Sequence, residues 1–224
     1  MPLRLSAQDR RQQIMQVATG LFARQGFQGT TTRQIAEEAG INEALLFRHF
    51  PSKENLYCTL IEELCLARGR KQRIHQILKS GGDDTQVFTA IACEFLCRTP
   101  RDTELTRLLW FTALENHTLS ARFFRNYAAV YYEALAGYIA ERTRQGAFRK
   151  IDPLLSARGF LGMVVYHFLI QELFSGEKYQ QFNPEEVAAT LTAIWLAGMQ
   201  SVHANGANGH YVRSKKKTAK ACQN

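Results

Sequence analysis

Apolar residues recur along most of this chain at the three- and four-residue spacing of an α-helix. The clearest set lies near the N-terminus and comprises Ile14, Val17, Ala18, Leu21 and Phe22. Gly26 and Gly29 follow this set, so the first helix is expected over about residues 6–25. No alternating strand pattern longer than a few residues appears, and the sequence therefore predicts an all-α fold.

Two short helices are expected directly after the first one. Thr31 stands three residues before Gln34, which is the spacing of a capping box, and Gly40 ends the helix that Thr31 begins. Asn42 is a good N-cap for a second short helix that runs to about residue 50. Two short helices joined by a few residues are typical of a helix-turn-helix, whose second helix enters the DNA major groove.

The rest of the chain continues the helical pattern. Pro51 breaks the second short helix, and Ser52 can cap a long helix from Lys53 to about Lys79. Five further helices are expected at about 86–98, 102–115, 119–145, 153–174 and 184–203. The expected fold is all-α with about nine helices.

We divide the chain into a helix-turn-helix domain over 1–52, a larger helical domain over 53–204 and a tail over 205–224. The tail has glycines, lysines and few large apolar groups, and it is expected to be disordered. The formal net charge is +8, and five of the positive charges lie in this tail: Arg213, Lys215, Lys216, Lys217 and Lys220. The smaller positive excess of residues 1–53 suits a polyanion without proving one.

Several classes of protein are disfavoured by what the sequence lacks. No apolar run reaches the roughly 18 residues that cross a bilayer, and the N-terminus does not read as a signal peptide. We therefore expect a cytoplasmic protein without a membrane partner. The five cysteines form no CxxC pair, which favours reduced thiols. Motifs for hydrolase, metalloprotease or phosphate-loop chemistry do not occur, so neither an enzyme nor a cofactor or metal site is expected.

The second short helix shows large apolar residues on two faces. Leu46, His49 and Phe50 share one face, and the residues on the other are Ala44, Leu45, Phe47 and Arg48. Leaving a Leu and a Phe exposed forgoes about 2–3 kcal/mol of burial free energy, which indicates a surface for a partner. Against DNA, Leu45 can contact thymine methyls, Arg48 can bond guanine, and Glu43 can accept from cytosine.

The residues of this region also match a known family. The pattern T-T-x-R-x-I-A-x-x-A-G-I-N-x-x-x-L-F-x-H-F-x-x-K-E-x-L, within about Gly26–Leu56, closely resembles the TetR family of bacterial transcriptional regulators. The resemblance implies a three-helix DNA-binding domain, a ligand-binding and dimerising domain, and a homodimer on an operator. It also implies that ligand binding tilts the fourth helix, and that Lys53 meets the DNA backbone. The remaining chain matches only in length and helical character.

Three positions depart from the usual family pattern. Where the family commonly has Ser, Gly and Tyr, this chain has Asn42, Ala44 and Phe47. Phe47 lacks the phosphate-binding hydroxyl and is expected to make only a van der Waals contact. The expected DNA-binding residues are Thr31, Thr32, Arg33, Asn42, Glu43, Ala44, Leu45, Phe47, Arg48, His49 and Lys53. Arg48 can also be a solvated surface arginine, Glu43 can serve the helix dipole, and His49 can support packing.

Aromatic residues are concentrated over 102–148, where they form either a core or a pocket for an apolar or aromatic ligand. The expected ligand-binding residues are Trp110, Phe111, Tyr127, Tyr131 and His167. The helix at 153–174 is apolar nearly all round, and the helix at 184–203 carries small residues that allow close approach, so these two are expected to form a dimer interface. Its expected residues are Phe160, Val164, Phe168, Leu191, Trp195 and Met199.

These observations predict a DNA-binding transcriptional regulator, most simply a repressor released from a palindromic operator by a small, largely apolar or aromatic ligand. A second hypothesis is a thiol- or metal-responsive sensor, or an all-α enzyme, that carries a helix-turn-helix. Cys93 and Cys97 lie one helical turn apart, which permits a thiol or metal sensor, but a buried cysteine is commonly a small packing residue.

Overall fold

The computed structural model describes residues 6–97, 100–115 and 117–200. Helices account for nearly all of these residues, and the only β pairing among them is a single antiparallel bridge between Phe148 and Gln200. The elements are α1 (Ala7–Gly29), α2 (Thr32–Glu38), α3 (Glu43–His49), α4 (Lys53–Ala67), α5 (Arg70–Lys79), α6 (Asp84–Leu96), α7 (Pro100–Glu115), α8 (His117–Phe123), the π-helix η1 (Phe124–Ala128), α9 (Ala129–Arg144), α10 (Pro153–Glu172), the 3₁₀ turn η2 (Gly176–Lys178) and α11 (Pro184–Met199). The predicted all-α fold class is confirmed. The expected tail over 205–224 lies outside the described residues.

The helix starts follow the capping residues in the sequence. Thr31 and Gln34 form the predicted capping box at the start of α2. The Asn42 side chain accepts from the Leu45 backbone N–H at 2.8 Å, and Ser52 caps α4 in the same way. Each side chain satisfies a backbone donor that has no partner within its helix, so these boundaries are fixed locally.

Two expected helices are divided in the structure, which raises the number of α-helices in the described residues to eleven. The helix expected over 53–79 ends at Ala67, and Gly69, with a φ of 54°, is the N-cap of the separate helix α5. The helix expected over 119–145 becomes α8, the π-helix η1 and α9. The apolar periodicity continues across both breaks, which is why the sequence pattern did not reveal them.

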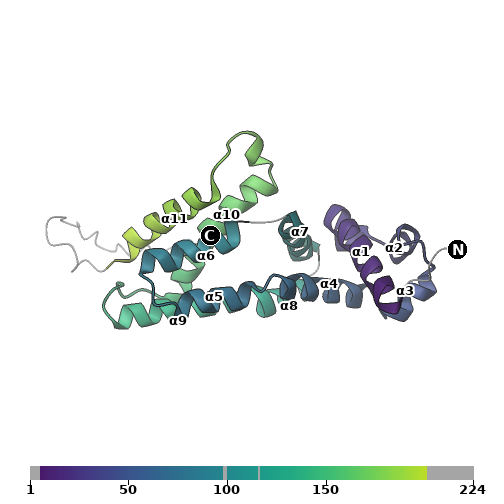
Figure 1. Cartoon of the computed structure of the whole chain (residues 1–224), viewed down its shortest axis with the longest axis horizontal. Helices are drawn as coiled ribbons and strands as arrows, with labels where there is room; N and C mark the ends of the chain where they lie inside the picture. The colour runs from purple at the N-terminus through teal and green to yellow at the C-terminus, as the bar shows by residue number, and fades with distance from the viewer. Residues whose placement is uncertain (1–5, 98–99, 116, 201–224) are drawn as a thin grey trace, which may run out of the picture.

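The molecule is elongated, with α1–α3 at one end and α9 and α11 at the other (Figure 1). One hydrophobic core joins α1–α4 with α7 and α8, and a second core joins α5, α6 and α9–α11. Tyr57 of α4 is fully buried in the first core beside Phe22 and Phe27. The helix-turn-helix therefore shares its core with the helices that follow residue 52.

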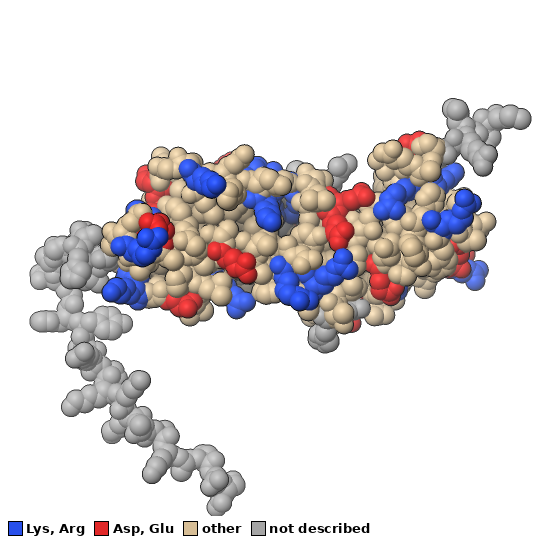
Figure 2. Space-filling view, turned by 90° about the horizontal axis from the view of Figure 1, so that it is seen from below, with Lys and Arg blue, Asp and Glu red and all other residues tan. Residues whose placement is uncertain are grey.

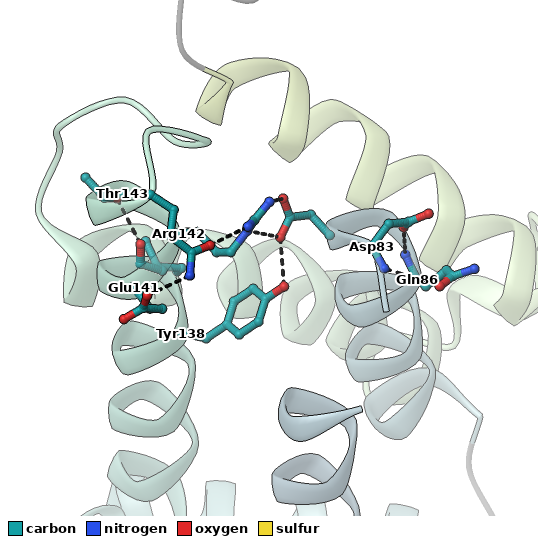
Figure 3. Close-up of polar contacts among 9 residues, drawn as sticks. Asp83, Gln86, Tyr138, Glu141, Arg142 and Thr143 are labelled. Atoms are coloured by element: carbon teal, nitrogen blue, oxygen red, sulfur yellow. Dashed lines mark hydrogen bonds and ion pairs between the residues drawn. The ribbon is translucent and has the colours of Figure 1, made fainter. Parts of the chain in front are cut away.

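The second core is built around α10. This helix is long and apolar enough to cross a membrane, the one such helix in the described part of the chain, but its Phe160 and Val164 side chains are fully buried in the protein core. At the far end, Arg142 of α9 makes a two-pronged ion pair with Asp84 of α6, and the Tyr138 hydroxyl donates to the same carboxylate at 2.8 Å (Figure 3). These contacts fix the C-terminal end of α9.

Candidate DNA interface and ligand cavity

Three side-chain contacts hold the helix-turn-helix together. Thr32 donates from Oγ1 to Glu43 Oε1 at 2.7 Å and so joins α2 to the start of α3. Arg11 of α1 donates to the His49 carbonyl oxygen at 3.1 Å, and its guanidinium lies 4.3 Å from the centroid of the Phe50 ring. Because both ends of α3 are tied to the other two helices, its outer face has a defined orientation.

The two faces of α3 separate as the sequence pattern predicted. Leu46 and Phe50 are fully buried, whereas Ala44 and Arg48 are exposed and Phe47 is 43% exposed. Leu45 is half-buried, so it has less free surface than expected. Among the described residues, no group forms a hydrogen bond or ion pair with the Arg48 guanidinium. The outer face of α3 thus presents apolar contacts and one available bidentate donor.

Other residues expected at the DNA interface also have roles within the fold. Thr31 and Asn42 are the N-caps of α2 and α3, and the Glu43 carboxylate is held by Thr32. The Arg33 guanidinium pairs with Glu37 at 2.9 Å, and this hydrogen bond raises the pKa of Arg33.

Lys53 links the start of α4 to the end of α1. Its Nζ donates to the Phe27 carbonyl oxygen at 2.9 Å and to the Thr30 carbonyl oxygen at 3.0 Å, and it lies 4.3 Å from the centroid of the Phe27 ring. Two of its three N–H donors are therefore used inside the protein. A phosphate contact by Lys53 stays a prediction that rests on the third.

Charge is dispersed over the face of the molecule drawn in Figure 2. Basic and acidic side chains alternate along its length, also at the end that carries α1–α3 (Figure 2). This face shows no continuous basic band. A contribution of Arg48 to DNA binding stays a prediction.

A cavity of about 300 Å³ lies between the helices of the two cores. Its walls come from α4–α10, and its lining residues are Cys65, Arg68, Arg70, Phe95, Leu105, Thr106, Leu109, Trp110, Ala113, Ser120, Phe123, Phe124, Tyr127, Ala128, Tyr131, Tyr132, Leu161, Val165 and Phe168. Three expected ligand residues, Trp110, Tyr127 and Tyr131, belong to this lining, whereas Phe111 and His167 do not. Arg68 and Arg70, on either side of Gly69, also line the cavity and were not expected there.

Buried polar groups mark this cavity. Arg70 is only 8% exposed, and its guanidinium carbon lies 4.8 Å from the centroid of the Phe95 ring. Burial raises the pKa of Tyr127 to about 12 and also raises the pKa of Tyr131, so both hydroxyls are neutral donors at physiological pH. Burial likewise raises the pKa of the Cys65 thiol to about 11.

His167 lines a second and more polar cavity of about 540 Å³. The residues around it are Leu96, His167, Phe168, Gln171, Glu172, Glu177, Lys178, Gln181, Phe182 and Pro184. The His167 ring packs edge-to-face on Phe182 with centroids 5.5 Å apart, and burial lowers its pKa. The structure therefore separates His167 from the aromatic residues with which it was grouped.

The expected dimer-interface residues lie inside the protomer. Phe160, Val164, Phe168, Trp195 and Met199 are all buried in the protein, and Leu191 is half-buried. The six residues chosen by periodicity thus lie on the inner faces of α10 and α11, and a dimer interface on these two helices stays a prediction. The exposed residues of the two helices include Leu154, Leu155, Arg158, Gly159, Gly162 and Tyr166 on α10 and Ala189, Thr190, Ala193, Ile194, Ala197 and Gly198 on α11. A Cβ added at Gly159 or Gly162 would meet no other atom within 4 Å, so this face lies open.

Helix α7 connects the cavity with the DNA-binding helices. Leu105 and Trp110 line the cavity, while Arg107 donates to the Ala23 carbonyl oxygen of α1 at 3.1 Å. The Glu115 carboxylate accepts from the Gln28 backbone N–H at 3.0 Å. The buried Tyr57 hydroxyl is 2.7 Å from the Leu108 carbonyl oxygen of α7. One helix thus contacts the cavity, α1 and α4.

The alternative of a metal sensor gains no support from the described residues, in which no group of three or more His, Cys, Asp and Glu side chains is placed to hold an ion. Burial, and next the neighbouring Cys97 thiol, raises the pKa of Cys93 to about 11. A thiol with so high a pKa reacts slowly, because the thiolate is the reactive form.

Both the N-terminal and the C-terminal part of the chain match known protein families. The model of the tetR family of bacterial regulatory proteins matches residues 14–58. The model of the C-terminal domain of AefR-like transcriptional repressors matches residues 87–197. The nucleoid occlusion factor SlmA of Vibrio vulnificus strain YJ016 is 30% identical over 189 residues, which cover 83% of this chain and 95% of that protein.

Solved structures show the same fold. The ketosteroid transcriptional regulator KstR2 of Mycobacterium tuberculosis superposes with a TM-score of 0.63 at 18% identity, covering 88% of this chain and 97% of that one. AibR, in a complex with isovaleryl coenzyme A and operator DNA, gives a TM-score of 0.64 at 21% identity, with coverage of 83% and 97%. The helix-turn-helix, the helical second part and these matches together show that the chain belongs to the TetR family of bacterial regulatory proteins.

Proposed function

We propose that this DNA-binding regulator is a homodimeric repressor that a small ligand releases from a palindromic operator. The observation that carries the proposal is the outer face of α3, where the available Arg48 guanidinium stands on a helix held at both ends. Arg48 would bond the O6 and N7 atoms of a guanine, and Ala44, Leu45 and Phe47 would make apolar contacts. The protein would act in the cytoplasm, where its operator lies.

Dimerisation would use the outward faces of α10 and α11. Small residues such as Gly159, Gly162 and Ala197 let helices approach closely, and Leu155, Tyr166 and Ile194 supply apolar area. Pairing the two helices with their copies gives a four-helix interface. A two-fold axis there would present two α3 helices to successive major grooves about 34 Å apart.

Ligand response would run from the cavity to α1 and α4. A ligand changes DNA binding only if it binds one arrangement of the DNA-binding helices more tightly than the other. Helix α7 has the contacts for this, because it lines the cavity and holds α1 through Arg107 and Glu115. A ligand that shifts α7 or the α4–α5 junction would therefore shift the recognition helices.

The test is selection of bound sequences from random DNA, followed by titration of the selected operator. Arg48→Ala should weaken operator binding by about 1–3 kcal/mol and flatten the preference at one base pair in each half-site. Arg149→Ala, an exposed arginine at the opposite end of the molecule, is the control for net charge. If both variants lose the same operator affinity and keep the base preference of the parent, α3 does not recognise the bases.

A second candidate function comes from the relatives named nucleoid occlusion factors, one of which is 30% identical over nearly its whole length. In that case the protein would act in nucleoid occlusion, as the name of that relative states, and not as a regulator of a few genes. Mapping of the bound sites in the cell separates the two, because a local repressor should occupy few operators near regulated genes. The cavity beside α7 favours the ligand-released repressor.

A further inference from the structure

We propose that the ligand of the 300 Å³ cavity is a neutral, largely apolar molecule with a carbonyl group, to which the hydroxyls of Tyr127 and Tyr131 donate hydrogen bonds. This inference rests on the proposed ligand response and specifies the class of the ligand. It adds a hydrogen-bond acceptor to the apolar or aromatic molecule expected from the sequence.

The wall that carries the two tyrosines is one face of a continuous helical segment. Tyr127 belongs to the π-helix η1, and Tyr131 belongs to α9, which follows η1 directly. The lining residues of this segment form two rows with a spacing of four residues, one with Phe123, Tyr127 and Tyr131 and one with Phe124, Ala128 and Tyr132. Side chains four residues apart on a helix are neighbours, so two such hydroxyls can reach the same ligand oxygen.

Neither of these two hydroxyls is used inside the protein. Within the described part of the chain, the Tyr127 and Tyr131 hydroxyls form no hydrogen bond. Burial raises the pKa of Tyr127 to about 12 and also raises the pKa of Tyr131, so both hydroxyls keep their proton at physiological pH. A hydroxyl that is removed from water is stabilised by a hydrogen bond, which an acceptor on the ligand would supply.

The rest of the wall suits a ligand that accepts hydrogen bonds and donates none. Among the 19 lining residues, all in the described part of the chain, none is Asp, Glu, Asn, Gln or His, and eight are aromatic. Carboxylate, amide and imidazole acceptors are therefore missing from the lining, whereas tyrosine hydroxyls can donate. A ketone or an ester has this combination of an apolar body and a lone acceptor. The volume of about 300 Å³ is at the lower end for ligand pockets, which fits a compact molecule.

Organic cations and anions are the two rival classes of ligand. An aromatic cavity can bind a cation through cation–π contacts, but no carboxylate among the described lining residues would balance its charge. An anion would lose its hydration. Arg68 and Arg70 also line the cavity, but both interact with other groups of the protein, so an anion would have to exchange those interactions for new ones. Entry therefore costs a charged ligand more than a neutral one.

The position of the two tyrosines connects the carbonyl to regulation. The Cys65 thiol of α4 lines the same cavity and is an electrostatic neighbour of both Tyr127 and Tyr131. A carbonyl held by the two hydroxyls would therefore lie beside the C-terminal part of α4. Because α4 leads directly to the helix-turn-helix, a ligand there can favour one arrangement of the DNA-binding helices over another.

Titration of the purified protein without DNA tests the ligand class. Butyrophenone, para-propylbenzoate and para-propylbenzylammonium share a benzene ring with a short alkyl chain, and they carry a carbonyl, a negative charge and a positive charge. Calorimetry should show that butyrophenone binds at least tenfold more tightly than either ion. Equal or tighter binding of either ion, or no binding of butyrophenone up to its solubility limit, would overturn the inference.

Variants that remove one oxygen atom assign the carbonyl to the tyrosines. Tyr127→Phe and Tyr131→Phe should each weaken butyrophenone binding about three- to tenfold, because the carbonyl oxygen loses one donor. Butylbenzene has the same carbon skeleton without the carbonyl, and its affinity, measured by competition with butyrophenone, should fall by no more than about twofold in either variant. Comparing each probe between parent and variant removes the difference in hydrophobicity between the two probes.

Tyr179→Phe is the matched control, because Tyr179 is 87% exposed and does not line the cavity. This variant should bind both probes as the parent does. The inference fails if Tyr127→Phe and Tyr131→Phe bind butyrophenone as tightly as the parent, or if they weaken butylbenzene as much as butyrophenone. An equal loss of butyrophenone binding in the control would also refute a role of the cavity hydroxyls.

Folding of each variant is followed by helicity, so that a misfolded Tyr131→Phe leaves Tyr127→Phe to decide. Operator binding by the parent is measured separately, first without and then with butyrophenone. If the operator binds but butyrophenone does not, the carbonyl inference fails and the DNA-binding function stands. If butyrophenone binds through the two tyrosines but leaves the operator bound, the ligand class stands and the proposed release fails.

Discussion

At the scale of single residues, the ammonium group of Lys53 holds the end of α1 against the start of α4. Several polar residues of the helix-turn-helix act in the same way: Asn42 caps α3, and Thr32 bonds Glu43. Their first effect is to orient α3. Fewer of the expected residues remain available for direct DNA contact, and under the proposed function Arg48 would be the principal one.

Lys53→Met should lower the free energy of unfolding by about 1–3 kcal/mol, because the Phe27 and Thr30 carbonyl oxygens lose a charged donor. Thermal or denaturant unfolding measures this change. Affinity for DNA should fall equally on every sequence, since Lys53 is not expected to contact a base. An unchanged stability would contradict the structural role. If the slope of log K against log salt concentration also falls by about 1 in this variant, Lys53 contacts a phosphate in addition.

The cysteines should leave DNA binding insensitive to mild oxidants at neutral pH. Burial raises the pKa of Cys65 and of Cys93 to about 11, so both are protonated and slow to react. DNA binding by the parent and by a double variant, Cys93→Ser with Cys97→Ser, should respond equally to hydrogen peroxide. Release of DNA by oxidant in the parent alone would support the thiol-sensor hypothesis.

At the scale of elements, glycines with positive φ interrupt two of the expected helices, Gly26 inside α1 and Gly69 between α4 and α5. Arg68 and Arg70, which line the cavity, lie on either side of Gly69. Gly26 has φ 75° and ψ 176° inside α1, a conformation that is essentially limited to glycine. Its kink aims the Gln28 backbone N–H at Glu115 of α7.

Gly26→Ala should destabilise the protein by about 1–3 kcal/mol through backbone strain. In addition, a Cβ at Gly26 would lie 2.2 Å from Glu115 Oε1 and displace the contact between α7 and α1. Gly29→Ala is the matched control, because its Cβ would meet only the Gln25 Cβ at 3.4 Å. Denaturant unfolding of both variants measures the difference, and equal stability of the two would refute the strain.

At the scale of the whole molecule, two cores succeed each other along an elongated chain, with the cavity where they meet (Figure 1). Helix α7 belongs to the first core and lines the cavity, so the cavity and the DNA-binding helices are only one helix apart. The open face of α10 and α11 lies on the second core, and a dimer formed there would leave the helix-turn-helix end free for DNA.

Ile194→Glu should convert the dimer to a monomer at micromolar concentration without loss of helicity, because Ile194 is 59% exposed and outside the core. Leu114→Glu, at an exposed leucine on α7, should remain dimeric. Light scattering and circular dichroism measured in parallel decide the outcome. A monomeric parent protein would refute the two-fold operator, and a dimeric Ile194→Glu would place the interface elsewhere.

The sequence by itself determined the helical fold class, the helix-turn-helix and the family. These depend on local rules: apolar spacing defines each helix, and side chains such as Thr31, Asn42 and Ser52 satisfy backbone donors within three residues. The two faces of α3 followed from the same periodicity. Of the five residues expected to bind a ligand, Trp110, Tyr127 and Tyr131 line one cavity and Phe111 and His167 do not, and ligand binding itself stays a prediction.

Only the tertiary structure decided which apolar face meets the protein's own core and which remains open. On α10, Phe160 and Leu155 are equally apolar, and burial depends on helices that lie far away in sequence. The same holds for charge. In the sequence Arg70 looks like an ordinary surface arginine, but in the structure it is buried beside Phe95. Spacing along the chain specifies a helix, but the neighbours that determine burial and cavity chemistry are fixed only by packing.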